Sequence, residues 1–114
     1  MSPAGEGAAA RLARRYRKAS LVWYHVLDLA EGEPLHEGIG AGFDISRTGF
    51  GITTMRPVPL GTRIFVQLRC REFELTIVAR VMRVRLVQGS QCEVGLQIVV
   101  APPDQRALLD RLFP

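Results

Sequence analysis

A polar segment near the middle of the chain, Asp44–Gly49 (Asp-Ile-Ser-Arg-Thr-Gly), combines residue types suited to contact with a polar ligand. Asp and Ser side chains bond nearby backbone in turns and Gly accepts a positive φ, so the segment is expected to close a hairpin even without a ligand. Asp44 and Ser46 are spaced i, i+2, which at a strand end directs both side chains to one side. With the exposed backbone near Gly49, they can offer a carboxylate and a hydroxyl to a nucleobase edge and a phosphate.

The second candidate is a basic arm, Arg11–Lys18, which concentrates the positive charge of the chain. It contains four arginines and one lysine, whereas the formal net charge of the whole chain is +4. Guanidinium groups bind phosphate bidentately, lie flat on aromatic planes and read the O6/N7 edge of guanine. This local charge favours a small anionic ligand or an acidic partner. Nucleic acid is not favoured, because its binders spread cations over a face and stack bases on several aromatic residues, and only 7% of this chain is aromatic.

Constellations that support enzymatic chemistry are absent from the sequence. His25 and His36 fall in different predicted elements with no nucleophile signature nearby, and His25 lies in an apolar strand where a packed histidine is expected. Phosphate-binding glycine loops, zinc-protease motifs and serine-hydrolase motifs are missing. Cys70 and Cys92 lack metal-ligand spacing, and we interpret both as core or strand thiols in a reducing compartment. We therefore expect no catalytic residue, no metal site and no cofactor.

The composition predicts a single folded domain. The chain has 114 residues, of which 47% are hydrophobic and 23% charged, values typical of globular proteins. Residues 1–10 contain no large apolar side chain besides Met1 and are expected to form a tail, which leaves 11–114 as the domain. No apolar run approaches the length of about 20 residues that spans a bilayer. Ser20–Leu29 follows basic residues but includes His25 and Asp28, so we expect no signal peptide, no membrane insertion and a cytoplasmic location.

Alternating apolar residues and turn signals predict a mostly β structure. In the Arg63–Cys70 strand, for example, Ile64, Val66 and Leu68 share one face, and the alternation of the next strand slips near Val78–Ala79, which indicates a bulge. We expect six strands and a C-terminal helix over Asp104–Phe113, arranged as a small antiparallel barrel or sandwich. The predicted strands are Ala19–Leu29, Gly38–Phe43, Phe50–Met55, Arg63–Cys70, Phe73–Val87 and Cys92–Val100.

The arm and the turn together resemble the PilZ domain family, cytoplasmic bacterial receptors for the second messenger cyclic diguanylate (c-di-GMP). The family pattern is RxxxR in a leader, then [D/N]xSxxG between the second and third strands of a barrel. The second motif is complete here in Asp44, Ser46 and Gly49, and Gly95–Ile98 resembles the family's final strand. The resemblance covers about Arg11 to Phe113. It implies an all-β fold, a six-stranded antiparallel β-barrel with a short C-terminal helix.

The resemblance also implies a receptor mechanism without catalysis. The leader arginines would hold the phosphates and guanines of c-di-GMP, and Asp44 would bond a guanine edge. Ser46 and Gly49 would contact the ligand near the turn. Binding would order the leader and change the surface that an effector protein meets, an effector that the sequence does not identify.

The leader motif has two possible registers. An intact RxxxR is formed by Arg11 and Arg15, whereas the start of the first strand favours Arg14 and Lys18, where lysine keeps the charge but loses the planar fork. Phe50 also stands where the family often has a second glycine, and its ring can crowd the turn. The second register suggests an alternative function, a PilZ-like adaptor that binds proteins without c-di-GMP, as in type IV pilus machinery or motility.

Overall fold

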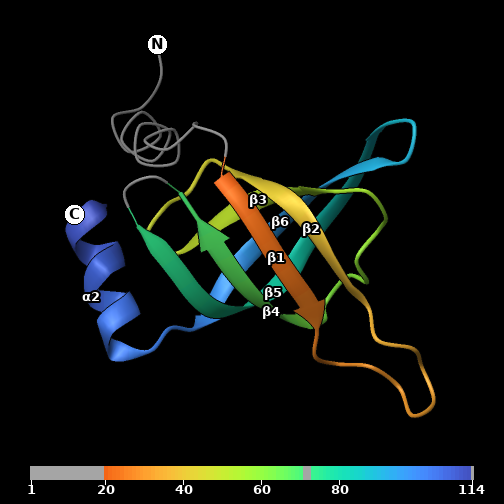
Figure 1. Ribbon diagram of the computed structural model, residues 1–114, viewed down its shortest axis with the longest axis horizontal. Helices are drawn as coiled ribbons and strands as arrows, with labels where there is room; N and C mark the ends of the chain where they lie inside the picture. The colour runs from red at the N-terminus through yellow and green to blue at the C-terminus, as the bar shows by residue number, and fades with distance from the viewer. Residues whose placement is uncertain (1–19, 71–72, 114) are drawn as a thin grey trace.

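The computed structural model describes residues 20–70 and 73–113, which form a closed antiparallel barrel and one helix (Figure 1). The strand order around the barrel is β1-β2-β3-β6-β5-β4. The prediction of a six-stranded barrel with a C-terminal helix is therefore confirmed, and the sandwich is excluded. The predicted tail 1–10 and basic arm 11–18 lie outside the described residues. The elements are β1 (Ser20–Val26), β2 (Glu37–Phe43), β3 (Gly49–Thr54), β4 (Arg63–Arg69), β5 (Glu74–Gln88), β6 (Gln91–Val100) and α2 (Pro103–Leu112).

The barrel interior is filled by the apolar residues that alternate along the strands. On β4 the predicted inward residues Ile64, Val66 and Leu68 are at most 1% exposed, and β1 contributes Val22 and Tyr24 in the same way. Successive side chains of a strand point to opposite faces, so one row from each strand enters the core. Leu109 of helix α2 and Phe113, the residue that follows the helix, are also buried and complete this core.

Strand β2 contributes glycines where its neighbours contribute large side chains. Gly38, Gly40 and Gly42 pair with the inward-facing residues of β1, and a Cβ added at Gly38 would lie 2.6 Å from Oη of Tyr24. The alternating glycines predict a close approach by backbone or ligand, and the structure shows which of these occurs. The Tyr24 ring, the Thr53 carbonyl and the Leu68 side chain occupy the space, so these glycines serve internal packing.

Strand β5 is the longest strand and bends around the barrel through three irregularities in its pairing with β6. The register shifts between Val78 and Ala79, as predicted, and again between Val81 and Arg83 and between Leu86 and Gln88. A bulge inserts an extra residue into one strand and so changes the face that the following side chains occupy. The second shift, which was not predicted, changes the orientation of Arg83.

Helix α2 begins at Pro103, and two residues separate it from β6, the last strand of the barrel. Proline suits the first turn of a helix because its missing N–H would have no partner there. The side chain of Gln105 accepts a 2.7 Å hydrogen bond from the Thr76 N–H of β5. In Figure 1 the helix lies at the end of the barrel where β1 begins. Within the described residues, no helix is long and apolar enough to cross a membrane.

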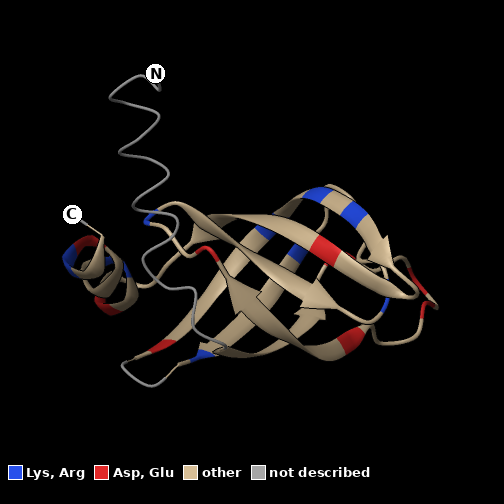
Figure 2. Ribbon diagram, turned by 90° about the horizontal axis from the view of Figure 1, so that it is seen from above, with Lys and Arg blue, Asp and Glu red and all other residues tan. Residues whose placement is uncertain are grey.

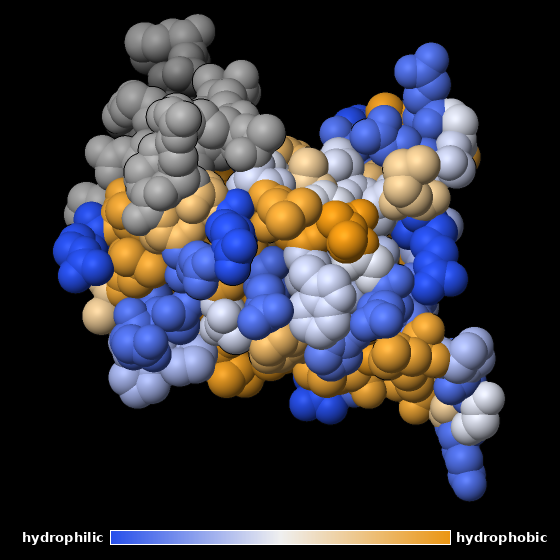
Figure 3. Space-filling view, in the orientation of Figure 1, coloured by the Kyte–Doolittle hydropathy of each residue, from blue (hydrophilic) through white to orange (hydrophobic). Residues whose placement is uncertain are grey.

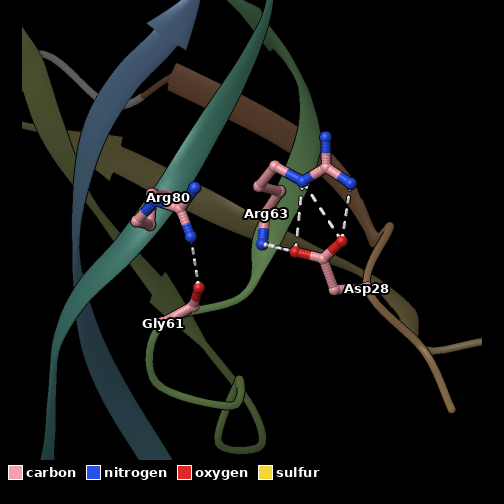
Figure 4. A network of polar contacts seen from close by, with 4 residues as sticks. All are labelled: Asp28, Gly61, Arg63 and Arg80. Carbon is pink, nitrogen blue, oxygen red and sulfur yellow. Dashed lines mark hydrogen bonds and ion pairs between the residues drawn. The ribbon is translucent and has the colours of Figure 1, made fainter.

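Charged residues of both signs are interspersed over the barrel and the helix (Figure 2). Some of them form a network that connects the end of β1 to β4 (Figure 4). Asp28 accepts a 2.7 Å hydrogen bond from Nη2 of Arg63 and a 2.8 Å bond from its backbone N–H. The Arg63 side-chain bonds, followed by the backbone bond, lower the pKa of Asp28 from 3.8 to about 2. Nearby, Arg80 donates to the carbonyl of Gly61 at 2.8 Å.

Replacing this carboxylate, Asp28→Asn, is expected to flatten the acid limb of the stability curve. The folded-state pKa lies below the ordinary value, so the charged pair stabilises the fold above about pH 4. That contribution is lost as the pH falls from 3.8 toward 2. Urea unfolding between about pH 6 and about pH 2.5 measures the slope of the free energy of unfolding against pH. Glu31→Gln, which removes an exposed carboxylate of the same loop, should keep the wild-type slope; an unchanged slope in Asp28→Asn would contradict the assignment.

Candidate ligand-binding site

The turn between β2 and β3 is held by hydrogen bonds between its own residues. The Ser46 hydroxyl donates to the Gly49 carbonyl at 2.9 Å and accepts from the Gly49 N–H at 3.2 Å, and the Ser46 N–H donates to the same carbonyl at 2.8 Å. Ile45, 1% exposed, anchors the turn in the core. The segment therefore closes the hairpin as predicted, and Ser46 already has a structural role. With its proton on the Gly49 carbonyl, the hydroxyl retains an acceptor position, which suits an N–H donor of a ligand better than a phosphate.

Asp44 has a backbone conformation that few residues adopt. Its φ is +49°, the only positive value at a described residue other than glycine. Asp and Asn tolerate this left-handed region because their short polar side chains bond locally. Asp44 directly follows β2, so the extended backbone of the strand ends at this residue and the turn begins. Aspartate at this position thus agrees with the demands of the turn as well as with ligand contact.

The three predicted turn residues, Asp44, Ser46 and Gly49, lie in the wall of one groove with a volume of about 360 Å³. The groove extends from the turn across the outer faces of β3 and β6 to β5. Other residues in its lining come from strands that the sequence did not connect with the turn. These are Phe43, Phe50, Gly51, Met82, Arg83, Gly95 and Leu96. The leader residues Arg11, Arg14, Arg15 and Lys18 lie outside the described part of the chain.

Helix α2 contacts the turn through the side chain of Arg106. Arg106 donates from Nη2 to the Arg47 carbonyl at 2.6 Å, and its Nε lies 3.3 Å from the Asp110 carboxylate one helical turn later. The backbone of the turn is also joined to β6, where the Ile98 N–H donates to the Thr48 carbonyl at 2.9 Å. Contacts with residues fifty or more positions later in the chain thus hold the turn in place beside the groove.

Comparisons with known proteins agree with this architecture. The family model described as PilZ domain matches residues 14–113. The chain belongs to the PilZ domain family. Among solved structures, it is similar to a chain described as the PilZ domain with c-di-GMP of YcgR from Escherichia coli, at 13% sequence identity and a TM-score of 0.56, over 85% of this chain and 88% of that one. No curated protein matches the sequence.

Membership of the PilZ family bears on the expected lack of catalysis. PilZ domains are non-catalytic c-di-GMP receptors, so the chain is not an enzyme. The histidines have packing environments: His25 stacks on Phe65 at a ring-centroid distance of 5.2 Å and meets Trp23 edge-on at 5.1 Å. Burial lowers the pKa of His36, whose Nε2 is enclosed without a hydrogen-bond partner in the described residues. Within the same residues, no group of three or more His, Cys, Asp or Glu side chains could hold a metal ion.

The position of Phe50 differs from what the PilZ resemblance suggested. The sequence suggested that its ring can crowd the turn, but Phe50 is 5% exposed and packs into the barrel core. Phe50 pairs with Leu96 of β6, another buried residue, so both point inward. Phe50 contributes to the base of the groove wall, and the next residue, Gly51, lies on the outward face of the strand, where it pairs with Gly95. A large residue directly after Gly49 therefore leaves the groove open.

A second hollow lies on the outer face of β1 and β4, next to Leu21, Trp23 and Gln67, with a volume of about 220 Å³. Its charged residues, Arg69 and Glu74, pair with each other at 2.6 Å. The face formed by β1, β2 and β4 shows apolar side chains interspersed with polar ones (Figure 3). Because the charges of this hollow already satisfy each other, the groove of the PilZ turn is the better candidate for an anionic ligand.

Sequence reasoning missed the part of the groove formed by Met82, Arg83 and Gly95. A strand arginine and a strand glycine are common and carry no motif, so neither stood out. The available signal was the interrupted alternation along β5, which was noticed at Val78–Ala79 and recurs between Val81 and Arg83. Gly95 in the final strand was a second signal, since a glycine inside a strand often marks close approach by another group.

Proposed function

We propose that this PilZ domain is a signalling receptor that binds c-di-GMP in the groove beside the turn, with the basic arm closing over the ligand. The observation that carries the proposal is that Asp44, Ser46 and Gly49 line one groove, which extends over β3, β6 and β5. The complex of c-di-GMP with the Escherichia coli PilZ domain, which has the same fold, supports the choice of ligand. Asp44 accepts hydrogen bonds from the N–H groups of a guanine edge, and Ser46 and Gly49 contact the ligand from the turn.

Strand pairing brings the start of the domain close to the turn. Ser20, the first residue of β1, pairs with Gly42, two residues before Asp44. An extended chain covers about 3.5 Å per residue, so Arg15 and Arg14 can reach roughly 20 Å from this point. That reach is enough for arginines of either register to contact the phosphates and guanines of a ligand in the groove. Their closure over the ligand changes the surface presented to an effector protein.

Calorimetric titration of the folded protein with c-di-GMP tests the proposal. We expect saturable binding with a Kd below about 100 μM, equivalent to a binding free energy of roughly −5.5 kcal/mol or better. Arg15→Ala should weaken binding if Arg11 and Arg15 form the motif, and Arg14→Ala should do so if Arg14 and Lys18 form it. The matched control is Arg17→Ala, which removes one charge of the arm and belongs to neither register.

Two outcomes of this titration contradict the proposal. Absence of heat with protein that is folded by circular dichroism would exclude c-di-GMP and favour the alternative, a PilZ adaptor that recognises only a protein partner. Equal, small losses for all three arginine variants would mean that the arm contributes charge without specific contacts. Capture of the same cellular partner by wild-type protein and by the Asp44→Ala variant would also support the adaptor.

A further inference from the structure

Four residues on four neighbouring strands form a row across the outer face of the sheet, inside the groove. Phe43 of β2 pairs with Gly51 of β3, Gly51 pairs with Gly95 of β6, and Gly95 pairs with Arg83 of β5. The row therefore has a planar aromatic ring at one end, a planar guanidinium at the other and two glycines between them. All four residues line the same groove as Asp44.

The two glycines allow the planar groups to lie against the sheet. A Cβ added at Gly51 would lie within 2.6 Å of Cε2 of Phe43, so the Phe43 ring covers Gly51 and no larger residue fits there. A Cβ at Gly95 would lie 3.4 Å from Nη2 and 3.5 Å from Cζ of Arg83. The guanidinium thus folds back over Gly95. The far edge of the Phe43 ring thus lies over Gly51, the Arg83 guanidinium lies over Gly95, and both planar groups line the groove.

The bulge in β5 is what directs Arg83 outward. Val81 pairs with Leu96 and is 1% exposed, and the register shifts before the next pair, Arg83 with Gly95. If the strand continued in regular alternation, Arg83, two residues after the inward Val81, would point into the core; the bulge at Met82 instead leaves it on the outer face. Bulges near functional sites often redirect a side chain in this way.

Arg83 also differs from the other outward-facing arginines of β5. Arg80 donates to the Gly61 carbonyl, and Arg85 pairs with the Glu93 carboxylate across the barrel surface. Arg83 is exposed and has neither a hydrogen bond nor an ion pair with any other residue that the structure describes. Its hydrogen-bonding groups and its outer face are available to a ligand.

We propose that Phe43 and Arg83 form a stacking platform for the purine bases of the ligand. One base packs on Phe43 beside Asp44, and the other stacks on the guanidinium of Arg83. Phe43 and Arg83 are three strands apart in the sheet, which corresponds to about 14 Å between their Cα atoms. Each side chain lies over the neighbouring glycine, toward the middle of the row. This span suits a ligand with two purines. The inference rests on the proposed function and adds a contact outside the leader and the turn.

Calorimetry with c-di-GMP on the full chain tests the platform. Arg83→Ala is expected to weaken binding about tenfold, because stacking of one base on a protein side chain typically contributes that much or more. Arg83→Lys keeps the charge but not the plane, so it should recover only a minor part of the loss. Phe43→Leu retains an apolar cover over Gly51 and should weaken binding several-fold through the other base.

The matched control is Arg85→Ala, which removes the same charge two residues later on the same strand and should leave the affinity unchanged. Thermal unfolding of each variant checks that the barrel is intact. An affinity of Arg83→Ala within twofold of wild type would overturn the platform, and so would full recovery by Arg83→Lys, which would show a role for charge alone. Absence of binding by the wild-type protein would instead contradict the proposed function itself.

Discussion

Asp44→Asn is expected to weaken c-di-GMP binding by about 10- to 100-fold, because hydrogen bonds to a charged group contribute roughly 1.5–3 kcal/mol. A carboxylate accepts two parallel hydrogen bonds from the N–H groups of a guanine edge. Asparagine offers one acceptor and places donors at the other position. The substitution is conservative for the fold, since asparagine tolerates the left-handed φ of +49° at this residue. Calorimetry with c-di-GMP measures the change.

A second variant at the same position separates recognition from turn stability. Asp44→Ala should lose affinity to a similar extent and also lower the free energy of unfolding by about 1 kcal/mol, because alanine is strained at positive φ. Glu37→Gln, which removes an exposed charge at the opposite end of β2, is the control for net charge and should bind normally. Wild-type affinity in Asp44→Asn would remove Asp44 from the binding site.

Gly40→Ala is expected to be the most damaging single substitution in the barrel, with a loss of about 3 kcal/mol or more in the free energy of unfolding. The added Cβ would overlap the carbonyl oxygen of Thr53, a backbone atom. That oxygen cannot move away without breaking the pairing of β2 with β3, which includes Ala41 with Thr53. Such a loss is a large part of the roughly 5–15 kcal/mol that stabilises a typical domain.

Urea unfolding followed by the fluorescence of Trp23, the only tryptophan of the chain, measures this effect. The control is Gly95→Ala, also a glycine within a strand, where the nearest atoms to an added Cβ are those of the Arg83 side chain at 3.4 Å. A flexible side chain can shift by a few tenths of an ångström, so this variant should stay within about 1 kcal/mol of wild type. Equal stability of the two variants would contradict the packing explanation.

Much of the local structure could be predicted from the sequence because it depends on neighbouring residues. The alternation of Ile64, Val66 and Leu68 predicted β4 and its inward face, and all three are buried. The predicted C-terminal helix, Asp104–Phe113, agrees with the observed α2, Pro103–Leu112, to within one residue at each end. Along β5, the interrupted alternation predicted the bulge at Val78–Ala79. These signals act over a few residues, so the sequence contains them directly.

The sequence suggested that Phe50 can crowd the turn, whereas the structure places this side chain in the core. A motif describes which residues follow one another, but the inward or outward orientation of a strand residue depends on the register with its partners. Pairing with Leu96 turns the Phe50 side chain into the core and leaves Gly51 on the outward face of β3. The effect of a residue next to a motif therefore required the pairing of β3 with β6.

The turn Asp44–Gly49 shows what the sequence alone determined about this protein. Its Asp, Ser and Gly residues specify a hydrogen-bonded turn and a PilZ motif, because turn chemistry is local. Only the tertiary structure decided what lies opposite that turn. Barrel closure pairs β3 with β6 and β6 with β5, and an extra residue in β5 turns Arg83 outward, so a side chain far away in the sequence faces the groove of Asp44. Pairing between distant strands depends on how the whole barrel buries its core, and no short segment carries that information.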